Sequence, residues 1–512
     1  MRTSIIAVSV LMAGCGWNHL PNQHEIQLDE ALWDAAATLP TEDGLYVRLS
    51  HVDGLALVNP DGSSAPVDLG PGSLTAVSAS PNLKSLLAFV TRTRCEDDNV
   101  KSSDLHECPS DERDNYTDLL IIEGGEAKLQ IELDSPYNSV RWSPDGNHAI
   151  AILDARAEGA EADGVVSLST VLAIDVVNGV AVPTPVGFAA TEVLFDDAST
   201  RAVVLSQNEV AVIDLATSPP AASVTFALTL DPDQVVNPVG IELTPDGDKA
   251  LISVQGDDSL YILDLINPSV NIKALSGQPT AMAVLEGSDR TVLVYESAAL
   301  ADVVEHERFD VESLVLDEPM TDIIEATNFN LLYATNNQLD VYRLDIETID
   351  DAVTYDLIEY RLQAAAQSMH LAPSEDFAIA LTNAGYLGGS FGMEILDLRP
   401  DSDETYPYAL EGRGVGLAFS ETEDTVHALL LQQDVDYLFQ MDLYTGDAEQ
   451  IDLSAPPVAI GSMPSGEFYI THDIGTGLVT FLDPATGNTT EAAGFATYGL
   501  MTVAQTVDTE EE

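Results

Sequence analysis

A short turn, repeated along the chain with a strand pattern on each side, constrains the fold more than any other feature. In its clearest copy, the turn Ser143–Gly146 lies between the apolar runs 140–142 and 149–153. Proline fixes φ at the first turn position, aspartate bonds to its own backbone, and glycine takes the left-handed conformation that the exit needs. Apolar runs of this length beside a turn are typical of buried strands. A second close copy, Thr244–Gly247, precedes the apolar run 250–254.

Weaker copies of the turn extend this pattern along most of the chain. They are Ser80-Pro81-Asn82, Phe195-Asp196-Asp197, Ala372-Pro373-Ser374-Glu375, Phe419-Ser420-Glu421 and Met463-Pro464-Ser465-Gly466. Neighbouring copies are roughly 42 to 65 residues apart and most are near 45, a spacing typical of propeller blades. The sequence is therefore a series of similar β units.

A second signature follows each turn, an apolar strand that ends in aspartate. Its members are Asp175, Asp214, Asp264, Asp345, Asp397 and Asp442. Because an aspartate at a strand end is well placed to accept hydrogen bonds from the next turn, we expect these residues to cap turns. A metal-ligand role is the alternative.

The Ser/Thr-Pro-Asp-Gly turn followed by a Val-Ile-Asp-Leu strand resembles the bacterial β-propeller repeats of the YVTN and TolB-like kind, and more loosely WD40 repeats. The resemblance covers Leu45 to about Val507, and the copies at Ser143 and Thr244 are nearest to the pattern. It implies an all-β fold, a single propeller of four-stranded blades around a channel. It implies no particular chemistry, because such folds include scaffolds, binding proteins and enzymes.

The number of repeat units is large for a propeller. Counting from Leu45 gives nine or ten units, whereas seven or eight blades are most common, so either the ring is unusually large or one or two units are insertions. The propeller is expected over 44–507, and we expect the run Tyr498–Val507 to pair with the first blade and close the ring. Residues 508–512 form an acidic tail.

The N-terminus has the pattern of a lipoprotein signal peptide over residues 1–14. Arg2 precedes the apolar run 5–13, which is too short to span a bilayer. The sequence ending in Cys15 resembles the bacterial lipobox, which implies acylation of that cysteine and anchoring to a membrane. Gly16 in place of aspartate favours the outer membrane. The polar leader 15–43 is then either a flexible stalk or a short helix, since Leu28, Ala31, Leu32, Ala35 and Leu39 fall at helical spacing.

The largest interruption of the repeat, residues 92–118, holds the two other cysteines, Cys95 and Cys108. In an exported protein, two cysteines in one polar loop predict a disulfide. The loop is also acidic, and Asp97, Asp98, Asp111 and Asp114 are candidate Ca²⁺ ligands. The spacing does not match an EF-hand, so a solvated loop without metal is favoured over a Ca²⁺ site. We expect this loop to be the recognition element if the protein has one.

The charge balance excludes some partners. The chain has 19 Lys+Arg against 85 Asp+Glu, a net charge of −66. Such a surface repels nucleic acid and anionic lipid headgroups, so neither is an expected partner beyond the bilayer reached by acylated Cys15. This excess of acidic residues suits a saline or Ca²⁺-rich medium, where dissolved ions reduce the range of the repulsion between charges to about 10 Å.

The search for catalytic motifs is mostly negative. Residues 388–392 fit the hydrolase pattern Gly-x-Ser-x-Gly but lie between two expected strands, with no helical pattern after them. No zinc or phosphate-binding motif is present. Arg141, Glu242 and His370 each stand three residues before the turn proline, on an innermost strand. We expect them at one level near the channel mouth, as candidates for binding an anion or substrate. The alternative is that they contact neighbouring blades or water inside the channel.

Two functions remain. The first is a membrane-anchored, extracytoplasmic propeller that binds or organises a protein or cell-envelope ligand such as a glycan. The alternative is a propeller enzyme, lactonase-like or a metal-dependent hydrolase, with its site at the channel mouth. The absence of a catalytic motif favours the binding module, located in the bacterial cell envelope.

Overall fold

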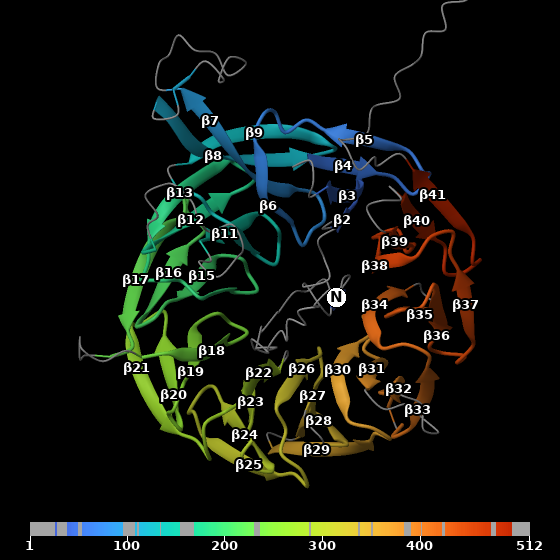
Figure 1. Ribbon diagram of the computed structural model, residues 1–512. Helices are drawn as coiled ribbons and strands as arrows, with labels where there is room; N and C mark the ends of the chain where they lie inside the picture. Colours follow the sequence, from blue (N-terminus) through green and yellow to red (C-terminus); the bar gives the residue numbers. More distant parts are fainter. Residues whose placement is uncertain are drawn as a thin grey trace, which may run out of the picture.

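The computed structural model describes residues 26–27, 38–49, 54–95, 108–109, 112–133, 135–153, 168–229, 236–285, 288–335, 338–349, 352–382, 391–400, 402–421, 425–472 and 478–493. These residues form ten antiparallel sheets arranged as the blades of one β-propeller (Figure 1). Within them, no helix is long and apolar enough to cross a membrane.

Every blade consists of four strands that are consecutive in the chain and ordered from the channel to the rim. Blades 1 to 3 comprise β2 (Thr38–Thr41), β3 (Gly44–Leu49), β4 (Gly54–Val58), β5 (Ser64–Val67); β6 (Ser73–Ala79), β7 (Leu86–Cys95), β8 (Arg113–Glu123), β9 (Glu126–Leu133); and β10 (Ser139–Trp142), β11 (His148–Ile152), β12 (Thr170–Asp175), β13 (Val180–Pro185). Blades 4 to 6 comprise β14 (Glu192–Phe195), β15 (Arg201–Leu205), β16 (Glu209–Asp214), β17 (Ala221–Ala227); β18 (Pro238–Leu243), β19 (Lys249–Val254), β20 (Ser259–Asp264), β21 (Ser269–Ala274); and β22 (Ala281–Leu285), β23 (Arg290–Val294), β24 (Leu300–Glu305), β25 (Val311–Val315).

Blades 7 and 8 comprise β26 (Asp322–Glu325), β27 (Phe329–Tyr333), β28 (Asp340–Ile349), β29 (Ala352–Arg361); and β30 (Ala366–Leu371), β31 (Phe377–Thr382), β32 (Phe391–Asp397), β33 (Thr405–Leu410). Blades 9 and 10 comprise β34 (Gly414–Glu421), β35 (Val426–Gln432), β36 (Tyr437–Asp442), β37 (Ala448–Asp452); and β38 (Pro457–Ser462), β39 (Phe468–His472), β40 (Leu478–Leu482), β41 (Thr489–Ala493). The large-ring interpretation of the repeat count is confirmed, because each repeat unit in the described ranges forms a blade of its own.

Antiparallel pairing gives the ring two different faces. The turns between first and second strands and between third and fourth strands share one face, which we call the turn face. The other connections lie on the opposite face, which we call the loop face. Blade 1 begins at Thr38, so its innermost strand lies within the segment that the sequence pattern assigned to the leader.

The repeated turn folds as its residue types require. In blade 3, Ser143 Oγ donates to Asp145 Oδ1 (2.6 Å), the amide of His148 donates to Ser143 Oγ (2.9 Å), and Gly146 has φ of 69°. A side chain at Gly146 would have its Cβ 2.5 Å from Asn82 Nδ2 of blade 2, whose amide donates to the carbonyl of Asp145 (2.8 Å). Glycine therefore provides both the left-handed backbone and the close approach of neighbouring turns.

Most of the strand-end aspartates cap turns as predicted. Asp264 accepts from the amides of Ile266 (3.0 Å) and Asn267 (2.7 Å), and Asp442 accepts from those of Tyr444 (2.9 Å) and Thr445 (3.1 Å). The turns after Asp175, Asp214 and Asp397 are capped in the same way. Asp345 differs because β28 and β29 stay paired beyond it, and it binds Arg343 instead (3.0 Å).

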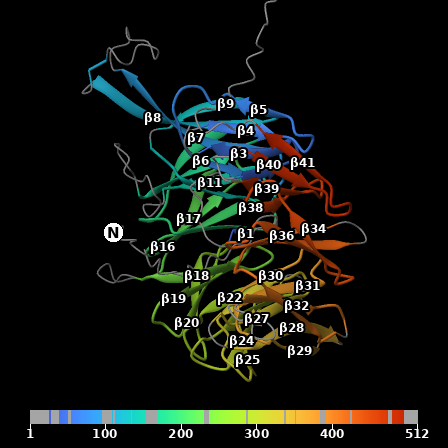
Figure 2. The ribbon, with the colours of Figure 1, turned by 45° about the vertical axis from the view of Figure 1, so that its right-hand side comes forward.

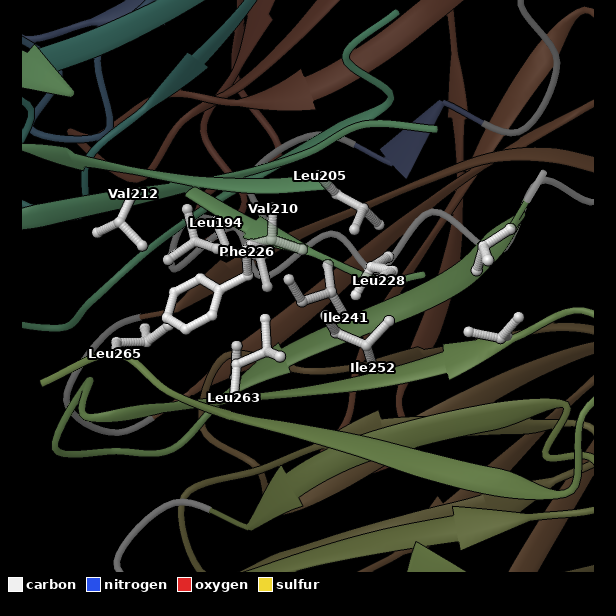
Figure 3. Close-up of a cluster of buried hydrophobic side chains, with 14 residues drawn as sticks. Leu194, Leu205, Val210, Val212, Phe226, Leu228, Ile241, Ile252, Leu263 and Leu265 are labelled. Atoms are coloured by element: carbon white, nitrogen blue, oxygen red, sulfur yellow. The ribbon is translucent and has the colours of Figure 1, made fainter. Parts of the chain in front are cut away.

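The core is distributed between neighbouring blades. Between blades 4 and 5, side chains from both sheets interdigitate, including Leu194, Val212, Phe226, Ile241 and Ile252 (Figure 3). Burying each such side chain is worth roughly 1.5–3 kcal/mol. A blade alone leaves one apolar face uncovered, so the blades are stable only as a ring.

The ring closes by packing between complete blades. Leu45 and Val47 of blade 1 share a buried cluster with Met463, Tyr469 and Phe481 of blade 10. The predicted closing run Tyr498–Val507 lies outside the described residues. The N-terminal β1 (Ile26–Gln27) pairs antiparallel with β34, the innermost strand of blade 9, with Ile26 opposite Leu417.

Candidate functional site

The second and third strands of blade 2 extend beyond the ring as a two-stranded ribbon. β6 pairs with β7 only as far as Thr91, and β9 pairs with β8 only from Thr117 onward. The pairing between β7 and β8 continues to Cys95 opposite Arg113. Figures 1 and 2 show these two strands standing out from the ring on the loop face. We call residues 92–95 and 113–116 with their connection the arm.

The base of the arm is anchored by a buried arginine. The Arg92 side chain forms an ion pair with Asp118, which is 1% exposed, and it also donates to the carbonyls of Leu69 (2.7 Å) and Pro71. Gln130 Nε2 donates to the same carboxylate at 2.6 Å. Because both charges have several polar partners, the pair can be buried without an unpaired charge. It ties the arm to the connection between blades 1 and 2.

A half-exposed arginine braces the middle of the arm. Arg94 of β7 binds Asp114 of β8 (2.9 Å) and Glu132 of β9 (2.7 Å), and its guanidinium lies 4.8 Å from the ring centre of Tyr116. Hydrogen bonds to Glu132 and Asp114 raise the pKa of Arg94 above its usual value. Three strands are thereby linked through one side chain.

The tip of the arm is closed by the predicted disulfide between Cys95 and Cys108, whose Cα atoms are 5.8 Å apart. Both cysteines are buried, and Arg113 Nε donates to the carbonyl of Cys108 (3.2 Å). The buried ion pair at the base, the Arg94 contacts in the middle and the disulfide at the tip together stabilise the described strand ends 92–95 and 113–116. This arrangement suits presentation of a loop to a partner.

The candidate Ca²⁺ ligands fall mostly outside the described residues. Asp97, Asp98 and Asp111 lie outside them, and Asp114 is occupied by Arg94. Among the described residues, no group of three or more His, Cys, Asp or Glu side chains is arranged to hold a metal ion. The calcium hypothesis stays a prediction.

The three channel candidates occupy matching positions in different blades. Arg141, Glu242 and His370 are each the penultimate residue of an innermost strand, in blades 3, 5 and 8. Arg141 is exposed, whereas Glu242 is only 2% exposed. Since blades 3 and 8 lie across the ring from each other, the structure does not bring the three side chains together (Figure 1).

His370 is hydrogen-bonded to Ser368 two residues earlier, with 2.9 Å between Nε2 and Oγ. A serine beside a histidine is the core of many hydrolase sites. Here burial lowers the pKa of His370 to about 4, which makes the imidazole a weak base at neutral pH. Ser390 of the Gly-x-Ser-x-Gly pattern lies outside the described residues.

Sequence reasoning missed a set of arginine clamps on the turn face. Arg343 of blade 7 stacks on Phe329 (4.3 Å) and donates to the carbonyl of Leu398 in blade 8. Arg399 of blade 8 stacks on Phe377 (5.1 Å). In blades 3 to 6 the second strand begins instead with a basic residue, His148, Arg201, Lys249 or Arg290. The recurrence of scarce basic residues at these second-strand starts was a readable signal, but Arg343 and Arg399 belong to third strands and their turns and shared no such pattern.

No protein-family model matches the sequence, and no curated protein matches it. Among solved structures, the chain is similar to the dihydro-heme d1 dehydrogenase NirN in complex with DHE, with 11% identity, coverage of 73% of this chain and 70% of that one, and a TM-score of 0.42. It is similar to apo AztD from Citrobacter koseri, with 14% identity, coverage of 64% and 92%, and a TM-score of 0.39. It is also similar to the Cps50 (Swd1) β-propeller domain of Myceliophteria thermophila, with 13% identity, coverage of 62% and 97%, and a TM-score of 0.35. Similarity at this level shows neither a family nor a function.

Proposed function

We propose that the chain is a lipid-anchored, extracytoplasmic binding module of the bacterial cell envelope, with YVTN or TolB-like repeats. The lipobox at Cys15 supports the anchor, and residues 1–14 support export. The Cys95–Cys108 disulfide fits an oxidising compartment. Replacing Cys15 with serine is expected to move the protein from the membrane to the soluble envelope fraction and to abolish labelling by a fatty-acid analogue. Unchanged membrane retention and labelling would contradict the anchor.

The arm is the part of the module that recognises the partner. Three separate interactions stabilise the arm: the buried Arg92–Asp118 ion pair, the ion pairs of Arg94 and the disulfide. A loop of the same size without them loses more conformational entropy when it binds. These three interactions of the described strand ends are the single observation that carries the proposal.

The partner is a protein or an envelope glycan. With 85 acidic against 19 basic residues, the surface repels polyanions and attracts cationic groups, which favours a partner with a neutral or basic face. Nucleic acid is not a partner in this proposal.

The recognition role is tested by replacing residues 97–106 with a flexible Gly/Ser segment of equal length, leaving both cysteines in place. The matched control replaces residues 155–164, which lie in the sequence between β11 and β12 of blade 3. We expect the arm variant to lose retention on envelope fractions of the native host, and the control to keep it. Equal retention of the arm variant and the unaltered protein would overturn the proposal.

The enzyme alternative has weaker support. Its best observation is the Ser368–His370 hydrogen bond, and a pKa of about 4 makes His370 a poor general base. Binding through the arm therefore explains more of the structure.

A further inference from the structure

A small pocket of about 280 Å³ lies on the turn face between blades 3 and 4. Blade 3 contributes the end of its repeated turn and the turn after Asp175, between its third and fourth strands. Blade 4 contributes the turn after Asp214. The polar lining residues are Asn147, His148, Asp175, Asn178, Thr217 and Ser218. Val177, Leu215 and Ala216 form the apolar part of the wall.

Both asparagines and the serine of this pocket donate a hydrogen bond within the protein, whereas Nδ1 of His148 is buried without a hydrogen-bond partner. Asn147 Nδ2 donates to Asp145 Oδ2 (2.8 Å), and Asn178 Nδ2 donates to Asp175 Oδ2 (2.7 Å). Ser218 Oγ also donates to Asp175 Oδ2, at 2.8 Å. Each bonded amide keeps its carbonyl oxygen as an acceptor and its second N–H as a donor, and each hydroxyl keeps its lone pairs.

The hydroxyl of Thr217 also donates within the protein, from Oγ1 to the carbonyl of Pro219 (3.2 Å), and keeps its lone pairs as acceptors. The lining therefore offers two amide oxygens, two hydroxyl oxygens and a carboxylate as acceptors, beside one N–H of each asparagine and the imidazole of His148. No lysine or arginine lines the pocket. A ligand that fits such a wall donates hydrogen bonds and carries positive charge.

The carboxylate of the pocket is buried but ionised. Asp175 is 2% exposed, and burial by itself raises the pKa of its carboxyl group. Hydrogen bonds from Asn178 and Ser218, with the nearby His148, outweigh burial and lower the pKa of Asp175 below its usual value. Asp175 forms no ion pair with a lysine or arginine among the described residues. Its charge is balanced by three hydrogen bonds, from the amide and side chain of Asn178 and from Ser218.

We propose that this pocket binds a small aliphatic amine, with its primary ammonium group held by Asp175, Asn178 and Thr217. The short methylene chain packs against Val177 and Leu215, of which Val177 is 70% exposed without a ligand. The net charge of −66 raises the local concentration of such cations. This proposal does not depend on the role of the arm.

The test is calorimetric titration of the protein with butylammonium chloride at constant chloride concentration. We expect saturable binding at one site. Asn178→Ala and Thr217→Val each remove an acceptor for a charged donor and are expected to weaken binding about tenfold. The matched control is Asn267→Ala, because Asn267 stands at the same position after the capping residue Asp264 in blade 5. It is expected to leave binding unchanged.

Two further cations decide which chemistry the pocket recognises. Tetramethylammonium has the charge without N–H donors, and K⁺ has the charge without a methylene chain, so both are expected to bind at least tenfold more weakly than butylammonium. Equal binding of either would overturn the proposal. It would also be overturned by the absence of saturable binding, or by Asn178→Ala and Thr217→Val variants that fold and bind like the unaltered protein.

Discussion

Thr38 donates a hydrogen bond from Oγ1 to the hydroxyl of Tyr469 at 3.1 Å, across the junction where the first and last blades meet. Both side chains are buried, and the two residues are 431 positions apart. Since the described blades 1 and 10 share no strand, this contact and the surrounding apolar cluster close the ring. The stability of the junction therefore depends on side-chain packing.

Tyr469 fits beside Gly461, and this pairing gives the first prediction. A Cβ on Gly461 would lie 2.3 Å from the Tyr469 ring, so Gly461→Ala must displace the ring. We expect a loss of about 2 kcal/mol in the free energy of unfolding. The control is Gly277→Ala, where a Cβ would meet Tyr295 at an ordinary 3.6 Å. Urea unfolding that shows equal midpoints for both variants would contradict this account of the junction.

Asp302 organises a cluster of hydrogen bonds in blade 6. Its buried carboxylate accepts from the amide and hydroxyl of Ser276 (both 2.9 Å), from Tyr295 (2.6 Å) and from Ser313 (2.6 Å). Because Asp302→Ala leaves several buried donors without a partner, we expect it to cost at least about 3 kcal/mol. The exposed Asp310→Ala is expected to cost less than about 0.5 kcal/mol. Thermal unfolding of the two variants measures the difference.

His306 makes stability depend on pH. Burial lowers the pKa of His306 to about 4, against an ordinary value of about 6.5. The folded state therefore binds this proton less tightly than the unfolded state. The contribution of neutral His306 to stability is complete above about pH 6.5 and is lost as the pH falls toward 4, by roughly 3 kcal/mol in total.

The measurement is the free energy of unfolding between pH 7 and pH 4 for the unaltered protein and for His306→Gln. His370 and His472 also have a lowered pKa and remain in both proteins, so the difference isolates His306. We expect a shallower pH dependence in the variant. Parallel curves would show that His306 does not contribute.

Salt is expected to stabilise the protein. A net charge of −66 produces repulsion across the whole surface, and raising NaCl from about 0.1 M to 1 M shortens the screening length from about 10 Å to 3 Å. The predicted result is a Tm that rises throughout this range. A Tm that stays constant or falls would show that the acidic surface does not limit stability.

The sequence predicted local structure well because local chemistry determines it. The repeated turn and the caps at Asp264 and Asp442 depend on a few adjacent residues, and both formed as expected. Asp345 did not cap a turn, because cross-strand pairing continued past it. The length of that pairing depends on the whole hairpin, so a short motif around Asp345 could not predict it.

Long-range placement was harder to predict. The disulfide was predictable because two cysteines in one loop had few alternatives, but the Arg92–Asp118 anchor joins strands whose register was unknown. Arg141 and His370 were predicted to share a level, which their matching strand positions support. Their separation across the ring depends on the blade count, which the weak repeats around blades 6 and 7 left undetermined.

Recognition through the arm is the central claim, and a photo-crosslinking amino acid at Asn115 tests it most directly. Asn115 is exposed on the arm, and the exposed Asn271 on the outer strand of blade 5 is the matched control. In cells of the native host, we predict a discrete crosslinked product from position 115 and none from position 271. A product from position 271 alone, or from neither position, would contradict the claim.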